Sequence, residues 1–375
     1  GMWSLSGQAN AKALDTWPYA PAPHLYAWGS NSSGQLGLGN TTTYSSPQQI
    51  GALTAWSNVS SGGTSTRAVK PDGTLWSWGN NSSGQLGLGN TTNYSSPKQV
   101  GLLTDWLKTA SGVNFVISVK TDGTMWSWGN NSNGKLGLGN TTAYSSPKQI
   151  GALTTWLNIT AGGYGYALAT KTDGTLWSWG INNNGQLGHN NTTPYSSPNQ
   201  VGALTNWLNV AAGYKFTVAT KADGTLWAWG QNNIGQLGLG NITYYSSPKQ
   251  VGALTTWLSC ATGNTYTLAT TTGGALWSWG YGLRGELGLG NTTNYSSPKQ
   301  VGALTTWSKI SAGRFFSMVI KTDGTLWSWG SNYTGQLGLG NTTYYSSPKQ
   351  VGSLSTWTAI SISGNGIALG IAVTD

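Results

Sequence analysis

The stretch Thr225–Gly230 reads TLWAWG, and it leads into the loop sequence GQLGLG at 235–240. Its Trp-Gly pair occurs first at Trp28 and then returns at Trp78, Trp128, Trp179, Trp229, Trp279 and Trp329. Successive copies are 50 residues apart, except for one step of 51. A period of this length is typical of repeat proteins, so the repeat decides the fold.

Each repeat contains the patterns of four short strands. Residues 216–220 alternate in polarity, and Asp223-Gly224 then leads into 225–230, which predicts a hairpin because this dipeptide suits a tight turn. Residues 246–251 (SSPKQV) follow a Gly/Asn/Thr-rich loop, with a proline where a strand starts. Residues 207–213 (WLNVAAG) precede the first run. We call these repeat positions A (216–220), B (225–230), C (246–251) and D (207–213).

Four short antiparallel strands per unit predict an all-β fold, a seven-bladed β-propeller of four-stranded blades. The chain enters the repeat at a B strand, Leu25 to Gly29, and ends after an A strand that reaches Val373. We therefore expect strands from both termini to share one blade and close the ring, which would leave no open sheet edge. The propeller is expected to span 25–375, and 1–24 to form an N-terminal connector.

The tryptophans are predicted to be structural. Residues two apart in a strand point to the same face, so each Trp-x-Trp pair places two rings together. Two large rings per unit can fill the space between neighbouring twisted sheets. The ring directly before glycine is the core residue of each unit: Trp78, Trp128, Trp179, Trp229, Trp279 and Trp329.

With its Trp-Gly, Asn-x-x-Gly-Gln-Leu-Gly and Ser-x-Pro elements, the repeat resembles the regulator of chromosome condensation family of seven-bladed propellers. The resemblance covers residues 25–375. It implies the fold, and for function it implies protein binding, as in a β-lactamase inhibitor of this architecture, or nucleotide exchange on a small GTPase. The family normally carries His in strand A, where this chain has Phe115, Tyr166, Phe216, Tyr266 and Phe316. We therefore do not carry the family's exchange activity over to this chain.

The N-terminal segment, from Met2-Trp3-Ser4-Leu5 to Trp17-Pro18, resembles the short leader of virion structural proteins of marine bacteriophages. This resemblance implies an extracellular or virion location, with contacts to other virion proteins through 1–24. Neither a signal peptide nor an apolar run long enough to cross a membrane is seen, so no membrane insertion is expected.

The net charge of +9 comes from fifteen Lys and three Arg against nine acidic residues. Nucleic acid is not an expected partner, because a binding footprint needs a clustered basic face, and five of the lysines are one repeated position: Lys98, Lys148, Lys249, Lys299 and Lys349.

No enzyme activity is expected. Two distant histidines, one cysteine and aspartates spread over hairpin turns provide no paired carboxylates and no metal cluster, so we predict no catalytic residues, no metal and no cofactor. The single glutamate, Glu286, is expected to pair locally with Arg284.

The repeats agree on one side and differ on the other. Antiparallel order places the A–B and C–D connections on one side, which we call the uniform face because they repeat TDGT and GALTTW. The B–C and D–A connections lie on the opposite side, the variable face. Loops on a rigid scaffold commonly carry binding residues, and Tyr and Arg are frequent anchors. The predicted ligand-binding residues are Tyr164, Tyr214, Lys215, Ile181, Gln231, Tyr281, Arg284, Arg314, Phe315 and Tyr333. Drift in unconstrained loops is the alternative explanation.

The sequence thus favours a non-catalytic propeller that binds a protein or glycan through its variable face. In the context of the leader, this would be a receptor-binding or decorating module of a phage particle that recognises a host-surface protein or glycan. The alternatives are a purely structural virion module and a cellular protein-interaction propeller.

Overall fold

The structure, a computed structural model, describes residues 23–363 and 367–373. Within these residues it contains 28 strands, one short 3-10 turn, η1 (Ser132–Gly134), and no α-helix. The predicted all-β class is therefore confirmed. The expected connector at 1–24 lies outside the described residues apart from Pro23 and His24, which already belong to a strand.

The strands pair into seven four-stranded sheets, in which a D strand pairs with the A strand that follows it. The innermost strands are β3 (Asn58–Gly62), β7 (Trp106–Ser111), β11 (Trp156–Gly162), β15 (Trp207–Ala212), β19 (Trp257–Thr262), β23 (Trp307–Ala312) and β27 (Trp357–Ile362). The second strands are β4 (Ser65–Val69), β8 (Phe115–Lys120), β12 (Tyr166–Lys171), β16 (Phe216–Lys221), β20 (Tyr266–Thr271), β24 (Phe316–Lys321) and β28 (Ile367–Val373). The third strands are β5 (Leu75–Gly79), β9 (Met125–Gly129), β13 (Leu176–Gly180), β17 (Leu226–Gly230), β21 (Leu276–Gly280), β25 (Leu326–Gly330) and β1 (Pro23–Gly29). The outermost strands are β6 (Tyr94–Gln99), β10 (Tyr144–Gln149), β14 (Tyr195–Gln200), β18 (Tyr245–Gln250), β22 (Tyr295–Gln300), β26 (Tyr345–Gln350) and β2 (Tyr44–Thr54).

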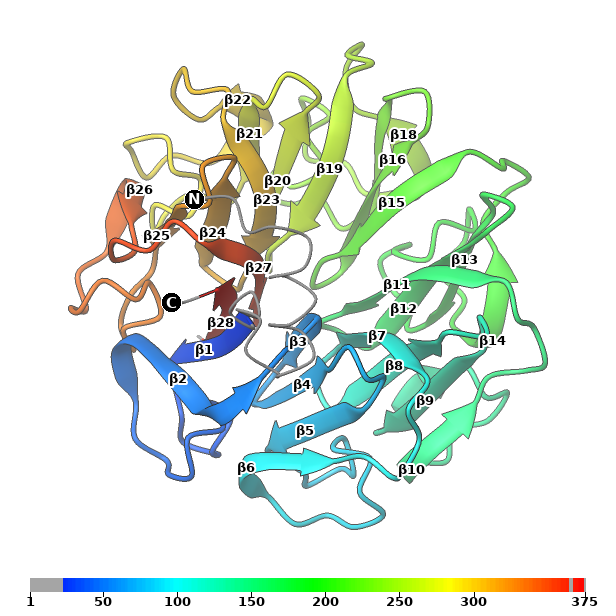
Figure 1. The fold of residues 1–375 in the computed structure, drawn as a ribbon. Helices are drawn as coiled ribbons and strands as arrows, with labels where there is room; N and C mark the ends of the chain where they lie inside the picture. Colours follow the sequence, from blue (N-terminus) through cyan, green and yellow to red (C-terminus); the bar gives the residue numbers. More distant parts are fainter. Residues whose placement is uncertain (1–22, 364–366, 374–375) are drawn as a thin grey trace, which may run out of the picture.

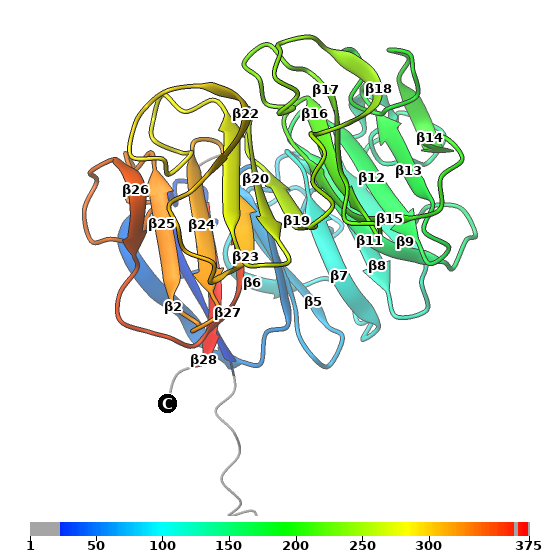
Figure 2. The ribbon, with the colours of Figure 1, turned by 90° about the horizontal axis from the view of Figure 1, so that it is seen from above.

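The sheets stand around a common centre, with β27, β3, β7 and β11 near the middle and β6, β10 and β14 at the rim (Figure 1). Each innermost strand contacts the next one, and β27 contacts β3. Seen from the edge, the sheets stand side by side with their strands running across the thickness of the ring (Figure 2). These observations define a β-propeller of four-stranded antiparallel blades.

One sheet is built from both ends of the chain. Its order is β2-β1-β28-β27, and β1 pairs with β28 along its whole length, from Pro23 opposite Val373 to Gly29 opposite Ile367. Strands from both termini thus share a blade, as the sequence predicts. This pairing covers two edges that would otherwise be open to another chain.

The tryptophan before each glycine is buried between neighbouring sheets. Trp179 has no exposed surface, and it packs with Phe115 and Ile150 of the preceding sheet. Its indole Nε1 donates a hydrogen bond of 3.0 Å to the backbone carbonyl of Lys135, in the loop between β9 and β10 of the preceding blade. The ring therefore joins two blades by apolar contact and by a satisfied polar atom.

The expectation that both rings of each pair are buried is corrected in part. The first ring is only partly buried: Trp177 and Trp227 lie at the uniform face, where Lys171 and Lys221 place their Nζ atoms 3.9 Å and 3.8 Å from the ring centroids. The first ring therefore packs against the core between the sheets and also has a cation over its face.

The connections lie on the two sides as expected. On the uniform face, the backbone N–H of Trp257 donates to the carbonyl of Gly224 at 3.0 Å, which joins a C–D connection to an A–B turn. On the variable face, the N–H of Gln231 donates to the carbonyl of Lys215 at 3.0 Å, which joins a B–C loop to a D–A loop. Gly230, next to Gln231, has a φ of +101°, and a Cβ there would lie 2.6 Å from the Lys215 carbonyl oxygen. The close approach of the two loops thus requires glycine.

Candidate functional site

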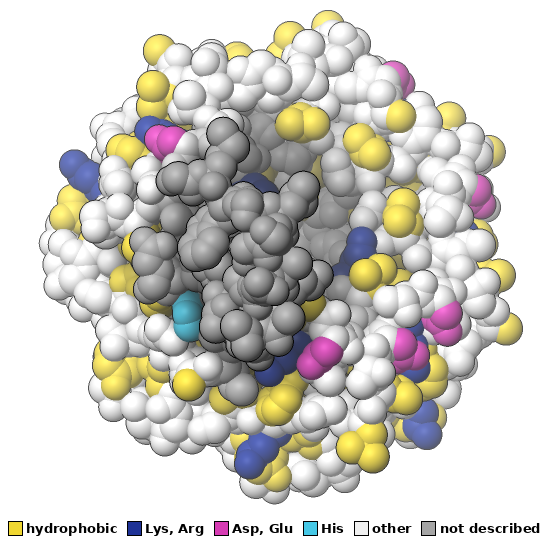
Figure 3. Space-filling view, viewed as in Figure 1, with side chains coloured by type: hydrophobic (Ala, Val, Ile, Leu, Met, Phe, Trp, Pro, Cys, Tyr) yellow, Lys and Arg dark blue, Asp and Glu magenta, His cyan; other side chains and the backbone are white. Residues whose placement is uncertain are grey.

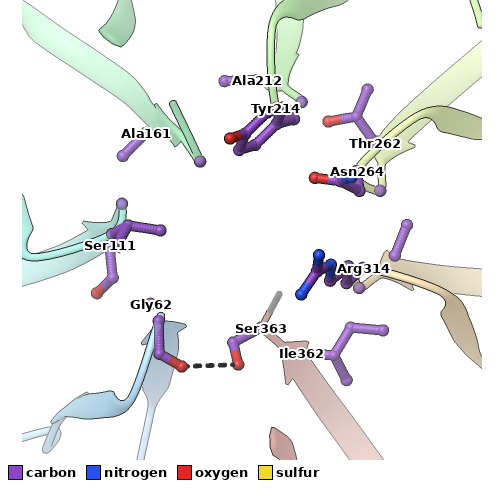
Figure 4. A pocket seen from close by; sticks show the side chains of 18 of the residues that line it. Gly62, Ser111, Ala161, Ala212, Tyr214, Thr262, Asn264, Arg314, Ile362 and Ser363 are labelled. Atoms are coloured by element: carbon purple, nitrogen blue, oxygen red, sulfur yellow. Dashed lines mark hydrogen bonds between the residues drawn. The ribbon is translucent and has the colours of Figure 1, made fainter. Parts of the chain in front are cut away.

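The variable face contains a central hollow of about 370 Å³. The ends of the innermost strands and the loops that follow them line it, and most of its lining residues are small, among them Gly62, Ser111, Ala161 and Ala212 (Figure 4). Ser363 and Gly63 form part of the wall together, because the Oγ of Ser363 donates a hydrogen bond to the carbonyl of Gly63 at 3.3 Å. Small residues at the ends of seven converging strands leave this space open.

Three larger polar side chains make the hollow asymmetric. Tyr214, Asn264 and Arg314 come from three successive D–A loops, and Figure 4 shows them at one side of the space. Tyr214 and Arg314 are both exposed. These three are the longest polar side chains that line the hollow, so they are best placed to contact a ligand there.

The first aromatic–cation cluster contains three predicted residues, Tyr164, Tyr214 and Lys215. The rings of Tyr164 and Tyr214 meet edge to face with their centroids 5.1 Å apart, although they belong to different blades. The Nζ of Lys215 lies 4.0 Å from the centroid of Tyr164 and 5.6 Å from that of Tyr214. The cluster thus bridges two D–A loops beside the hollow.

The second aromatic–cation cluster contains four predicted residues, Tyr281, Arg284, Arg314 and Phe315. The rings of Tyr281 and Phe315 have centroids 5.7 Å apart. The guanidinium carbons of Arg284 and Arg314 lie 4.2 Å and 5.1 Å from the centroid of Phe315. A B–C loop of one blade and a D–A loop of the next are therefore held together by one aromatic ring and two cations.

Glu286 lies beneath this second cluster. It has no exposed surface, and its Oε2 accepts the backbone N–H of Arg284 at 2.8 Å. The other oxygen, Oε1, is buried without a hydrogen-bond partner. Burial raises the pKa of this carboxyl from 4.5 to about 7, against smaller opposing effects of its hydrogen bonds and of Arg284. The expected pairing of Glu286 with Arg284 is thus a hydrogen bond to the Arg284 backbone. The ion pair found in the described residues joins Lys120 and Asp105.

Lys135 occupies the repeat position that Gln236 and Glu286 hold in other units. Its side chain is largely buried, which lowers its pKa to about 8. The Lys135 side chain lies next to Gly165. A Cβ on Gly165 would lie 3.3 Å from this side chain and 3.3 Å from the predicted residue Ile181. Lys135 and Glu286 were not among the predicted site residues, although each interrupts the Gly-Gln-Leu-Gly pattern and could have been found from that.

Two predicted residues stay apart from both clusters. Gln231 is half-buried and contacts the neighbouring loop through its backbone. Tyr333 is 52% exposed, and within the described residues no aromatic ring or cation is found against it. Seven of the ten predicted residues are therefore brought together, in two clusters.

The described part of the chain holds no group of three or more His, Cys, Asp or Glu side chains placed to bind a metal ion. It also holds no helix long and apolar enough to cross a bilayer. The chemistry visible at the hollow is hydrogen bonding, charge and aromatic contact.

A sequence profile described as the RCC1-like domain matches residues 24–370. The chain belongs to the RCC1-like family. No curated protein sequence matches it.

Among solved structures, the RCC1-like fold of this chain is similar to human WBSCR16, with a TM-score of 0.83 and 22% identity over 94% of this chain and 99% of the other. It is also similar to Prp20p from Saccharomyces cerevisiae, with a TM-score of 0.84 and 20% identity over 95% of this chain and 92% of the other. That structure is described together with the binding of Prp20p to Gsp1p and histones. At these identities the likeness shows the fold alone.

The tyrosines that replace the family's strand-A histidine hold the blades of this RCC1-like propeller together. The buried hydroxyl of Tyr166 donates to the carbonyl of Phe216 in the next sheet at 2.5 Å. Tyr266 repeats this contact with the carbonyl of Phe316 at 2.5 Å. Tyr166 and Tyr266 therefore stabilise the packing of neighbouring blades and are not part of the candidate site.

Proposed function

We propose that this seven-bladed propeller is a non-catalytic binding module that holds a macromolecular partner on its variable face. The observation that carries this is where the repeats differ. Copies that agree on the uniform face diverge on the variable face, and the divergent residues gather into two aromatic–cation clusters beside a central hollow. Random substitution in unconstrained loops would not be expected to bring large side chains from different blades into contact.

The composition of the two clusters supports recognition. Tyrosine and arginine are enriched at binding hot spots because they provide large contact areas and directed polar groups. The edge-to-face contact of Tyr164 with Tyr214, and the stacking of Arg284 on Phe315, hold these side chains in place before a partner arrives. Side chains that are already ordered lose less entropy on binding.

The resemblance of the N-terminal segment to phage virion leaders supports a more specific role. In that role the propeller is a receptor-binding or decorating module of a phage particle, outside the cell, which recognises a host-surface protein or glycan. Residues 1–24 would join it to other virion proteins. If instead the propeller only spaces other virion parts, its variable face should bind no cell.

A cell-binding assay tests this function. The labelled protein is added to a panel of marine bacterial isolates, and bound protein is measured by flow cytometry. Alanine at Tyr214, Tyr281 and Arg284 together should abolish binding. The matched control carries alanine at Leu204, Leu254 and Leu304, which are 45–49% exposed on the uniform face, and it should bind like wild type. Equal binding by both variants, or no binding of the wild-type protein to any isolate, would contradict the proposal.

A further inference from the structure

The charges of the molecule are divided between its two faces. In the described residues, the acidic side chains of the uniform face belong to A–B turns and to one C–D connection: Asp72, Asp105, Asp122, Asp173, Asp223 and Asp323. Figure 3 shows acidic side chains spread over the face that it views. The variable face has Glu286 as its one described acidic residue, and Glu286 has no exposed surface.

Three cations of the variable face lie at the hollow or next to residues that line it. Arg314 lines the hollow directly, and Arg284 stacks on the same Phe315 ring as Arg314. On the first cluster, Lys215 packs over Tyr164 and Tyr214, and Tyr214 lines the hollow as well. With no exposed described acid on this face, these three cations present positive charge at Arg314, which lines the hollow, and at Lys215 and Arg284, which contact rings next to it. Such a surface attracts an anionic partner and repels a cationic one.

The two aromatic–cation clusters are less suited to a neutral sugar than open aromatic rings are. A sugar ring usually packs against an open aromatic face, and in each cluster a cation lies over one ring, Tyr164 or Phe315. Lys215 lies 4.0 Å from the Tyr164 centroid, and Arg284 lies 4.2 Å from that of Phe315. The N–H groups of Lys215 and Arg284 that point away from the rings can still donate hydrogen bonds to carboxylates.

The arrangement also differs from a track for a polyanionic chain. The two clusters lie at one side of the hollow, and the D–A loop that carries the amide of Asn264 comes between the loops of Tyr214 and Arg314. A polysaccharide with a charge on every unit would need a continuous basic path. Cations on different blades, with the amide of Asn264 on the blade between them, suit a peptide, whose acidic side chains alternate with backbone amides.

We propose that the ligand of the variable face is an acidic segment of a protein chain, whose Asp or Glu carboxylates pair with Arg314 at the hollow and with Lys215 and Arg284 beside it. This inference rests on the proposed binding function and specifies the chemistry of its partner. Glu286 supports this loop, since its buried carboxyl accepts the backbone N–H of Arg284.

A random peptide library provides the probe. It is selected against three forms of the full chain: the wild-type protein, a K215Q/R284Q/R314Q variant, and a K249Q/K299Q/K349Q variant as a matched control. The control loses the same number of positive charges from the outermost strands, which lie at the rim of the ring (Figure 1). Coincident thermal unfolding curves for the three proteins establish that all are folded. A fluorescent octa-glutamate peptide and a heparin octasaccharide are titrated in parallel.

The proposal predicts that peptides selected on the wild-type protein and on the control variant are enriched in Asp and Glu, and that the enrichment disappears on K215Q/R284Q/R314Q. Octa-glutamate should bind this variant about tenfold more weakly than the control. Selected peptides without an acidic excess would overturn the inference while leaving the binding function intact. An acidic excess on all three proteins would assign the effect to net charge, and tighter binding of heparin would favour an acidic glycan; either result also overturns it. If neither peptides nor heparin bind the wild-type protein, the proposed function fails as well.

Discussion

At the scale of single residues, Glu286 is a buried residue that also contacts the loop of the proposed binding site, through the backbone of Arg284. In five of the other six units a glutamine stands there, and its Oε1 accepts a backbone N–H two residues earlier; Gln236 accepts that of Ile234 at 3.0 Å. Glu286 keeps this contact through Oε2, but it exchanges the amide donor for a second oxygen that is buried without a partner. A buried ionised oxygen without a donor costs free energy, which explains why the pKa is raised to about 7.

This cost leads to a pH-dependent prediction for Glu286→Gln. An acid with a raised folded-state pKa binds more protons in the folded than in the unfolded state between pH 4.5 and about 7, so the folded state loses stability as pH rises through that window. The substitution should therefore stabilise the protein by up to about 3 kcal/mol at roughly pH 8 and have little effect at roughly pH 4. Urea unfolding at both pH values measures this.

The reverse substitution in a neighbouring unit, Gln236→Glu, is the matched control. It places a carboxyl at a position that is fully buried in the structure, and it should destabilise the protein at roughly pH 8 but much less at roughly pH 4. A Glu286→Gln effect of equal size at both pH values would show that burial of charge is not its cause.

At the scale of elements, the hairpin between the second and third strands of five sheets is held by a short relay of hydrogen bonds. In the β16–β17 hairpin, the indole Nε1 of Trp227 donates to Thr225 Oγ1 at 2.8 Å, and that hydroxyl donates to Asp223 Oδ1 at 2.6 Å. The β20–β21 hairpin has Gly273 and Ala275 at the corresponding positions. Its tryptophan, Trp277, is correspondingly left with a buried Nε1 that has no partner.

Restoring the relay should stabilise this hairpin. The double variant G273D/A275T gives Trp277 Nε1 an acceptor and gives the new hydroxyl its own acceptor, which we expect to add about 1 kcal/mol to the free energy of unfolding. Urea unfolding of the double and both single variants measures it. Additive single effects would contradict the relay, since A275T should need G273D for its full benefit.

Local turn chemistry is also why so much of the fold was predictable. Asp-Gly turns, strand alternation and the Trp-Gly period are repeated, short-range signals, and the hairpins and the shared terminal sheet follow from them. The partial exposure of Trp177 could not be predicted, because it depends on Lys171 reaching across its ring from the neighbouring strand. The same holds for the site. Tyr164 and Tyr214 are adjacent only because two blades converge, whereas their place on the variable face followed from strand order.

At the scale of the whole molecule, stability depends on ring closure. The blades contact their neighbours in a circle, and the β1–β28 pairing completes it. Removing residues 367–375 should expose the edges of β1 and β27, which then become available for pairing with other chains. We expect this variant to form oligomers or aggregates in light-scattering measurements and to unfold at a lower temperature. A monomer with an unchanged unfolding temperature would show that the ring does not need its closing strand.

The central claim, that the variable face is the binding surface, is tested most directly by site-specific photo-cross-linking. The photoreactive residue p-benzoylphenylalanine replaces Tyr333 on the variable face, or Leu204 on the uniform face as a control of similar exposure. Each protein is irradiated on the bacterial isolate that binds the wild-type protein best, and adducts are identified by mass spectrometry. We predict an adduct from position 333 and none from position 204. An adduct from position 204 alone would contradict the account.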